Sequence, residues 1–241
     1  MLKDFAKRIL RRCRRTFRKD IDIFLKDSAG IIHVGANEGQ ERDLYASLGL
    51  PVIWIEPIPD VFRALRNNIS CYPNQRAFRY LITDENGKVY DFHVASNRGA
   101  SSSIFDLARH VEIWPEVSYI QTLKLDSVTL PTFLKRENIE IDLYNALVLD
   151  TQGSELLILR SASNVLRNFR YVKLEVPDFE AYKGCCTIDE VTQFMLNYGF
   201  LEKHRNRFAA ESPCGGRYYD IVYRNKRLTT PGWRNWQMRQ T

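Results

Sequence analysis

From residue 31 onward, short apolar runs alternate along the chain with stretches that show helical spacing. The apolar runs predict strands over 31–35, 51–57, 76–84, 89–94, 143–150, 170–176, 200–206 and 218–225. Helices are expected over 40–49, 60–69, 154–168 and 187–199. Strands and helices that alternate at this spacing predict a parallel sheet with helices on both faces, closed by an antiparallel pair formed by the last two strands.

Two of the expected helices begin with capping signals. Asp60 is placed to cap the helix over 60–69. Thr187 is followed three residues later by Glu190, the arrangement of a capping box. These signals support the helical assignment of both stretches.

The composition is that of a soluble globular protein. A chain of 241 residues can form one large domain, and its 44% hydrophobic and 27% charged residues are ordinary values. No apolar run approaches the roughly 18 residues of a membrane span, and the basic N-terminus lacks the apolar segment of a secretory signal. Five cysteines show neither a CxxC pair nor zinc-site spacing. We therefore expect a reduced, cytoplasmic protein without a bound metal.

The net charge of +6 is concentrated at one end of the chain. Residues 1–20 hold nine basic and two acidic side chains, so the remainder is almost neutral. Apolar residues in this segment lie on one stripe of a helix, at Leu2, Phe5, Ile9, Cys13 and Phe17. Such a helix could pack on the domain, lie on an anionic membrane surface or contact nucleic acid, of which the last is the least expected.

These observations divide the chain into three parts. We expect a basic amphipathic helical arm over 1–29, one large domain over 30–226 and a polar tail over 227–241. The oligomeric state is not indicated by the sequence.

The first predicted strand runs into a turn that suits a ligand. Gly35 ends the strand and Gly39 lies where the next helix begins, while Glu56 ends the second strand 21 residues after Gly35. A carboxylate at that distance can accept the ribose hydroxyls of an adenosine. The glycines form GxxxG and not the GxGxxG of dinucleotide sites, so a ligand without phosphates, S-adenosylmethionine, fits better. The expected contacts from this turn are Gly35, Ala36, Asn37, Glu38 and Gly39.

Further acids follow the later strands. Thr83 and Asp84 end the third strand, where they could contact adenine or simply form a turn. Asp150 ends an apolar strand and could bind the cofactor, orient a substrate hydroxyl or take its proton. Glu175 ends the next strand at the same predicted edge, and Glu155 lies in the first turn of a helix. Three such acids could hold a divalent cation, but no histidine completes a cage and no metal is expected.

Five segments in order, VGANEGQ, WIEP, GASSSI, LVLDTQGSELLILRSA and YVKLEV, resemble the FkbM family of S-adenosylmethionine-dependent methyltransferases. The resemblance covers roughly residues 30–205. It implies a class I methyltransferase (Rossmann-like) fold, a three-layer α/β sandwich around a mostly parallel seven-strand sheet with an antiparallel C-terminal hairpin. It also implies that Gly35, Asn37 and Glu56 bind the cofactor and that Asp150, Gly153 and Glu155 belong to the signature region.

The resemblance further implies O-methylation of a sugar, glycan or glycosylated natural product. Asp150, Gln152 and Glu175 are the candidate catalytic residues, although many family members have Glu where this chain has Gln152, which cannot accept a proton. Candidate substrate contacts are Ser102, Ser103, His93 and Glu155, with His110 as a second histidine near the same loop.

Three other functions remain open from the sequence. The first is an RNA methyltransferase that uses the basic arm, and the second is a non-catalytic module attached to a membrane. The third is a nicotinamide-dependent oxidoreductase, which would share the fold but is disfavoured by the missing GxGxxG. The acceptor pocket is expected between the loops over 95–120 and 205–217.

Overall fold

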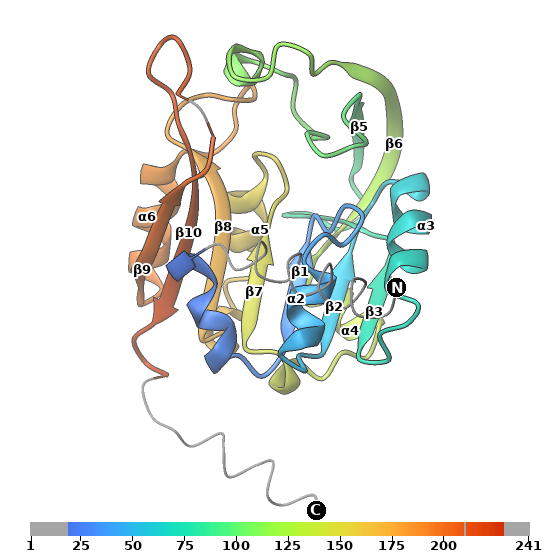
Figure 1. Cartoon of the computed structure of the whole chain (residues 1–241), viewed down its shortest axis with the longest axis vertical. Helices are drawn as coiled ribbons and strands as arrows, with labels where there is room; N and C mark the ends of the chain where they lie inside the picture. Colours follow the sequence, from blue (N-terminus) through green and yellow to red (C-terminus); the bar gives the residue numbers. More distant parts are fainter. Residues whose placement is uncertain (1–18, 210, 229–241) are drawn as a thin grey trace, which may run out of the picture.

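A computed structural model describes residues 19–209 and 211–228 of the chain. Its centre is a seven-stranded sheet with the order β3-β2-β1-β7-β8-β10-β9 (Figure 1). The strands are β1 (Ile31–Val34), β2 (Val52–Ile55), β3 (Gln75–Phe78), β7 (Ala146–Leu149), β8 (Tyr171–Pro177), β9 (Phe200–Arg207) and β10 (Tyr218–Asn225). The pairs among β3, β2, β1, β7 and β8 are parallel, whereas β10 is antiparallel to both of its neighbours. The predicted sheet with its antiparallel C-terminal hairpin is therefore confirmed.

The strand register places the functional candidates at one edge of the sheet. Val34 pairs with Ile55 on one side and with Leu149 on the other, so three strands end at the same level. The next residues along the chain are Gly35, Glu56 and Asp150. Because these strands are parallel, the residues that follow them meet at the carboxyl edge, where such sheets bind ligands.

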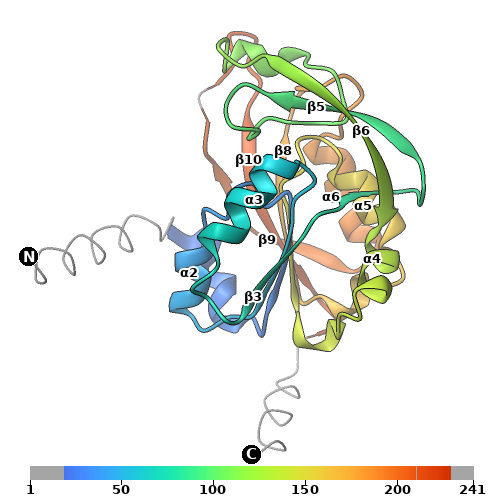
Figure 2. The same cartoon turned by 90° about the vertical axis from the view of Figure 1, so that its right-hand side faces the viewer.

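Helices cover both faces of the sheet, as Figure 2 shows with the sheet seen between them. One face packs against η1 (Lys19–Asp27), α2 (Arg42–Ser47) and α3 (Pro59–Asn68). The other face packs against α4 (Leu130–Arg136), α5 (Glu155–Ser161) and α6 (Ile188–Asn197). The alternation of side chains along β1 serves both layers, since Ile31 belongs to the first core and Ile32 to the second. The three-layer sandwich is thus as predicted.

The helix termini differ in part from the predicted ones. Asp60 does not cap α3, because the helix begins at Pro59 and Asp60 already lies within its first turn. Asp60 instead pairs with Arg63 one turn later. At the start of α6, the Glu190 carboxylate accepts a hydrogen bond from the backbone N–H of Thr187 at 2.9 Å, which confirms the capping box. The helix predicted over 154–168 is divided into α5 and η4 (Leu166–Asn168).

A second, three-stranded sheet stands above the carboxyl edge of the main one (Figure 1, upper right). Its order is β4-β6-β5, formed by β4 (Leu81–Thr83), β5 (Val89–Ala95) and β6 (Tyr119–Thr129). The single strand predicted over 76–84 is therefore two strands, β3 and β4, that belong to different sheets. The short helical turn η2 (Arg109–Glu112) completes the region, whereas η3 (Ile141–Leu143) lies between α4 and β7. We call the segment over 85–128 the upper lobe.

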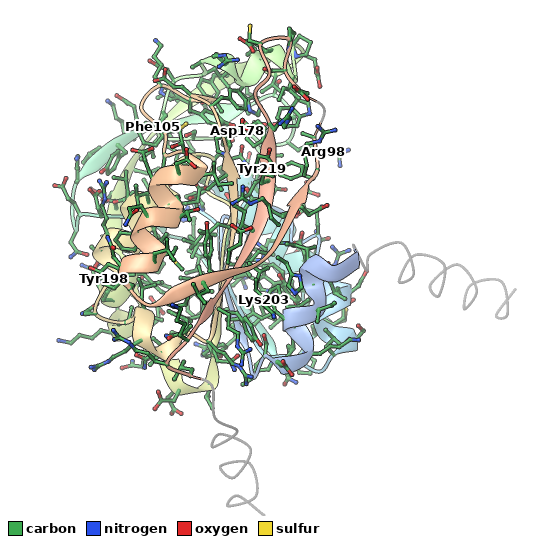
Figure 3. The ribbon with its side chains drawn as sticks, turned by 90° about the vertical axis from the view of Figure 1, so that its left-hand side faces the viewer. Arg98, Phe105, Asp178, Tyr198, Lys203 and Tyr219 are labelled. Carbon is green, nitrogen blue, oxygen red and sulfur yellow. The ribbon has the colours of Figure 1, made fainter. Side chains whose placement is uncertain are left out.

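Part of the segment predicted as an arm lies in the domain core. Ile21, Phe24 and Leu25 of η1 are buried, and the Phe24 ring lies 5.6 Å from that of Tyr171 on β8. The apolar stripe over residues 1–18 and the tail over 229–241 lie outside the described residues. Within the described part, no helix is both long and apolar enough to cross a membrane. The edge strand β9 carries mostly exposed side chains, among them Lys203 (Figure 3).

Candidate active site

A cavity of about 430 Å³ lies at the carboxyl edge of the main sheet, beneath the upper lobe. Eight of the predicted site residues line it, namely Gly35, Ala36, Asn37, Glu56, Ser102, Asp150, Gln152 and Glu175. Seven are not among its described lining residues, namely Glu38, Gly39, Thr83, Asp84, His93, Ser103 and Glu155. The structure therefore brings together residues that directly follow β1, β2 and β7 with Glu175 on β8, but it does not add Thr83 and Asp84 at the end of β4.

Gly35 allows β1 to end against the strand beside it. Its φ of +79° lies in the left-handed region, and a Cβ at this position would be 1.7 Å from the backbone oxygen of Asp150. No other residue type fits there. The close approach brings the turn after β1 to the catalytic candidates after β7.

Glu56 holds the same turn from the β2 side. Its carboxylate accepts hydrogen bonds from the backbone N–H groups of Asn37 and Ile58, each at 2.9 Å. Burial raises the pKa of Glu56 to about 7, although both N–H donors act in the opposite direction. Each carboxylate oxygen keeps a further lone pair, so Glu56 can also accept from ligand hydroxyls in the cavity.

Glu38 and Gly39, which were predicted to bind the cofactor, stabilise the turn and its packing against α3. The backbone N–H of Glu38 donates to the side-chain oxygen of Asn37 at 2.7 Å. A Cβ on Gly39 would lie 2.7 Å from the Leu65 side chain of α3, so this glycine allows the helix to pack closely. Neither residue lines the cavity in the described structure.

The expected adenine contacts of Thr83 and Asp84 are not supported. Thr83 is fully buried with its hydroxyl against the backbone of Glu85, and Asp84 accepts a hydrogen bond from Tyr90 at 3.1 Å. The prediction failed because the chain leaves the main sheet at Tyr80, so β4 no longer ends at the carboxyl edge. The cavity wall in this region is instead apolar, formed by Ile58, Leu81, Ile82 and Phe92.

Gln152 joins the two candidate catalytic acids. Its Nε2 donates to Asp150 Oδ1 at 2.7 Å and to Glu175 Oε1 at 3.2 Å. Tyr182 donates its hydroxyl to Gln152 Oε1 at 2.7 Å, which fixes the amide with its nitrogen toward the acids. Gln152 takes a φ of +53°, an uncommon conformation for a residue other than glycine.

The electrostatic environment favours protonation of these acids. Burial, followed by the negative charges of Glu155 and Glu41, raises the pKa of Asp150 to about 7, although the Gln152 hydrogen bond lowers it. Burial and the adjacent Asp150 raise the pKa of Glu175 well above its ordinary value. Both carboxyl groups therefore hold a proton more readily than an exposed carboxyl group does.

Glu155 does not contact the cavity, contrary to the prediction. Its fully buried carboxylate accepts hydrogen bonds from Thr151 N–H at 2.7 Å, the Thr151 hydroxyl at 3.0 Å and Gly153 N–H at 3.0 Å. These bonds close the turn that follows β7. Glu155 therefore shapes the loop that carries Asp150 and Gln152.

The two histidines also lie away from the reacting region. His93 stacks on Tyr119 with ring centroids 4.8 Å apart and contacts Thr122, on the β5–β6 sheet. His110 is buried between Tyr218 and Ser101, and burial lowers its pKa to about 4. Neither is among the described cavity-lining residues, so neither is placed to act as the general base.

The segment over 99–104, which we call the serine loop, places Ser102 at the cavity and Ser103 beneath the loop that follows β7. Ser102 lines the cavity while its hydroxyl accepts from Ala95 N–H at 2.9 Å. Ser103 is fully buried and donates its hydroxyl to the backbone oxygen of Gln152 at 2.8 Å. Ser103 thus supports the loop that carries Gln152 and is not among the described cavity-lining residues.

The sequence profile of the FkbM methyltransferase domain matches residues 33–202, well over half of the chain. This range contains the turn after β1, Glu56, the Asp150–Gln152 loop and Glu175. The chain belongs to the FkbM methyltransferase family. It is accordingly an S-adenosylmethionine-dependent methyltransferase, and the predicted family and cofactor are confirmed.

This FkbM protein is similar to one curated relative and to solved methyltransferases. The 2-O-methyltransferase NoeI of Sinorhizobium fredii is 23% identical over 223 residues, 89% of this chain and 86% of NoeI. Magnesium protoporphyrin IX methyltransferase (ChlM) of Synechocystis PCC 6803 with bound SAM superposes with a TM-score of 0.50. That match covers 90% of this chain and 84% of ChlM at 8% identity, so it supports the fold alone.

The cavity of the FkbM protein fits its cofactor chemically. Glu56 offers acceptors for ribose hydroxyls, and the apolar wall around Ile82 and Phe92 suits a flat base. Acidic side chains line much of the remainder, which suits a ligand that carries a positive sulfonium and a positive ammonium. Within residues 19–209 and 211–228, no cluster of three His, Cys, Asp or Glu could hold a metal ion.

Sequence reasoning missed the charged group on the α2 side of this cavity. Asp22, Glu41, Lys173 and Asp220 line it, together with His33 and Tyr45. Asp22 lies in the segment predicted as the arm. Glu41 and Asp220 lie in a predicted helix and a predicted strand for which the sequence indicated no site residue. Lys173 could have been identified as a candidate site residue from the sequence, since it is a charged residue within an otherwise apolar predicted strand.

Proposed function

We propose that this protein transfers a methyl group from S-adenosylmethionine to a hydroxyl oxygen of a sugar, glycan or glycosylated acceptor. The observation that carries the proposal is the arrangement of Asp150, Gln152 and Glu175 in the cavity, where a carboxylate of raised pKa can accept a hydroxyl proton. The similarity to NoeI, a 2-O-methyltransferase, supports transfer to oxygen.

When bound, the cofactor supplies an electrophilic methyl group on a sulfonium. The protein's own part is to hold and deprotonate the acceptor hydroxyl. Asp150 Oδ1 already accepts from Gln152 Nε2 at 2.7 Å, which leaves Oδ2 to accept the hydroxyl proton. Gln152 keeps the carboxylate oriented, and the raised pKa of Glu175 favours its neutral form, which adds no second negative charge beside Asp150.

The upper lobe supplies the wall opposite these groups. Ala100, Ser102 and Ile104 line the cavity from this lobe, at the end of the serine loop. We therefore place the acceptor between the serine loop and Gln152. This placement retains part of the predicted acceptor pocket over 95–120, whereas residues 205–217 do not line the described cavity.

The test is an assay of methyl transfer with labelled cofactor and a panel of sugars and glycolipids. Because Asp150 must be ionised to accept a proton, the rate on the true acceptor should rise with pH through about 7. Asp150→Asn should lower the rate by about 10²-fold or more. Asp91→Asn, an exposed acid on β5 paired with Lys124, should leave it unchanged.

A variant Asp150→Asn that keeps full activity and an unchanged pH profile would contradict the assigned role. Transfer to RNA and not to any sugar would favour the nucleic-acid alternative. Retained cofactor binding without turnover on any acceptor would favour a non-catalytic module.

A further inference from the structure

His110 is a buried histidine of the upper lobe that the proposed reaction does not use. It lies in η2, is 2% exposed and is not among the described cavity-lining residues. Its ring packs on that of Tyr182, with centroids 5.0 Å apart and an angle of 31° between the ring planes. Tyr182 is the residue that donates its hydroxyl to the Gln152 amide. His110 therefore contacts the group that orients the catalytic loop.

Two hydrogen bonds fix the His110 ring itself. Nδ1 lies 2.6 Å from the hydroxyl of Tyr218 on β10, and Nε2 lies 3.1 Å from the hydroxyl of Ser101. Because burial lowers the pKa of His110 to about 4, the ring is neutral at pH 7 and has one donor and one acceptor nitrogen. Such a ring can bond both hydroxyls at once, so it is held at two of its edges.

Backbone hydrogen bonds bring the His110 and Tyr182 segments together. The N–H groups of Ala108 and His110 both donate to the backbone oxygen of Ala181, at 3.0 and 2.9 Å. Leu107 and Tyr182 form an antiparallel bridge beside these bonds. The segment that leads into η2 thus runs along the segment that carries Tyr182, which places the two rings against each other.

The Tyr182 hydroxyl has two acceptors near it. Gln152 Oε1 lies 2.7 Å away, and the backbone oxygen of Ser101 lies 3.4 Å away. One hydroxyl proton cannot serve both equally, and the shorter distance assigns it to Gln152. A small movement of the tyrosine toward Ser101 would reverse this preference. His110 is bonded to Ser101 and packed on Tyr182, so it sets the spacing between them.

We propose that His110 is a positioning residue for methyl transfer, which keeps the Tyr182 hydroxyl on Gln152 and thereby the Gln152 nitrogen on Asp150. His110 acts only through Tyr182 and touches no reacting atom. The inference rests on the proposed function in one respect, namely that Asp150 takes the acceptor proton. It does not depend on which acceptor is methylated.

The test is the nuclear magnetic resonance signal of the Gln152 side-chain amide in the full-length protein, identified by its absence in Gln152→Glu. Nε2 donates to both Asp150 and Glu175, so its two protons should give separate signals and exchange slowly with water. His110→Leu keeps most of the side-chain volume but removes the ring and both of its hydrogen bonds. This variant should speed the exchange by about fivefold or more.

A double-mutant cycle separates positioning from a general loss of packing. Tyr182→Phe removes the hydroxyl through which His110 acts, so His110→Leu should add little to the exchange rate in that background. His204→Leu is the control, since this histidine lies on β9, paired with Val222 and away from the upper lobe. It should leave the Gln152 signal unchanged. In the methyl-transfer assay, His110→Leu should lower kcat by about three- to tenfold without a change in the KM for S-adenosylmethionine.

Calorimetric binding of S-adenosylmethionine shows whether each variant is folded. If His110→Leu does not fold, His110→Phe takes its place, because it keeps a flat ring and lacks only the two hydrogen bonds. An unchanged Gln152 signal, or additive effects in the cycle, would overturn the positioning role while the methyltransferase function stands. The proposed function fails separately, if Asp150→Asn keeps full activity, and the Gln152 signal does not depend on that result.

Discussion

At the residue scale, the orientation of the Gln152 side-chain amide affects the pKa of the neighbouring carboxyl groups of Asp150 and Glu175. Gln152 faces its nitrogen toward Asp150 and Glu175 only because Tyr182 donates to its oxygen. With the amide reversed, its oxygen would oppose the two carboxyl groups. Gln152 therefore lowers the pKa of Asp150 in the observed arrangement, and Tyr182 maintains it.

Tyr182→Phe should consequently reduce turnover by about three- to tenfold and raise the pH at which the rate is half-maximal. Loss of the hydroxyl allows the amide to turn, which removes the hydrogen bond that favours ionised Asp150. The pH–rate profile is the measurement. As a control, Tyr119→Phe removes a hydroxyl that donates to the backbone oxygen of Phe105. This change should leave the midpoint of the pH–rate profile in place. An unshifted midpoint for Tyr182→Phe would contradict this role.

The sequence predicted those residues whose position follows from the strand ends. Gly35, Glu56, Asp150 and Glu175 all lie at the carboxyl edge because a parallel sheet places them there. Lys173 stands out in the sequence as a charge within an apolar strand, but its closeness to Asp22 and Glu41 could not be predicted. That closeness depends on how η1 and α2 pack on the sheet, which the local sequence does not indicate.

At the element scale, the best predicted strands are those with an uninterrupted apolar run. β6 was missed although Leu123 and Leu125 alternate with polar residues, since one of its faces is exposed and its pattern is weak. The break between β3 and β4 was missed because only Arg79 and Tyr80 separate the two strands, with no Gly or Pro to mark a turn. The local hydrophobic pattern therefore identified the main sheet. The sheet of the upper lobe could not be predicted in this way, because it depends on the pairing of β6 with β4 and β5, which are distant in sequence.

The junction of β1 with β7 offers a test at this scale. Gly35→Ala should destabilise the protein by more than about 3 kcal/mol, because its Cβ would overlap the Asp150 backbone and its φ is positive. Gly49→Ala has a similar φ of +69° but nothing within 4 Å, and should cost only about 1 kcal/mol. Thermal unfolding measures both. Equal losses in the two variants would show that backbone strain alone matters at Gly35.

At the scale of the whole molecule, the basic charge of residues 1–20 is separate from an almost neutral domain. We predict that this segment brings the protein to anionic membranes, near a glycolipid acceptor. Deletion of residues 1–18 should abolish co-sedimentation with phosphatidylserine-containing vesicles and leave cofactor affinity unchanged. Neutral vesicles are the control. Salt-sensitive RNA binding that disappears with the same deletion would instead indicate a nucleic-acid partner.

The hydroxyl of Ser103 connects two parts of the molecule that are far apart in sequence. It joins the serine loop to the backbone oxygen of Gln152 at 2.8 Å, and Ser103 is itself bonded to His93 on β5. We therefore expect a displacement of the lobe by a bulky acceptor to shift the loop that carries Gln152. A substrate that fits poorly would lose contacts in the cavity and would also misalign the Asp150 carboxylate that takes its proton. Discrimination between substrates should therefore appear in turnover more than in affinity.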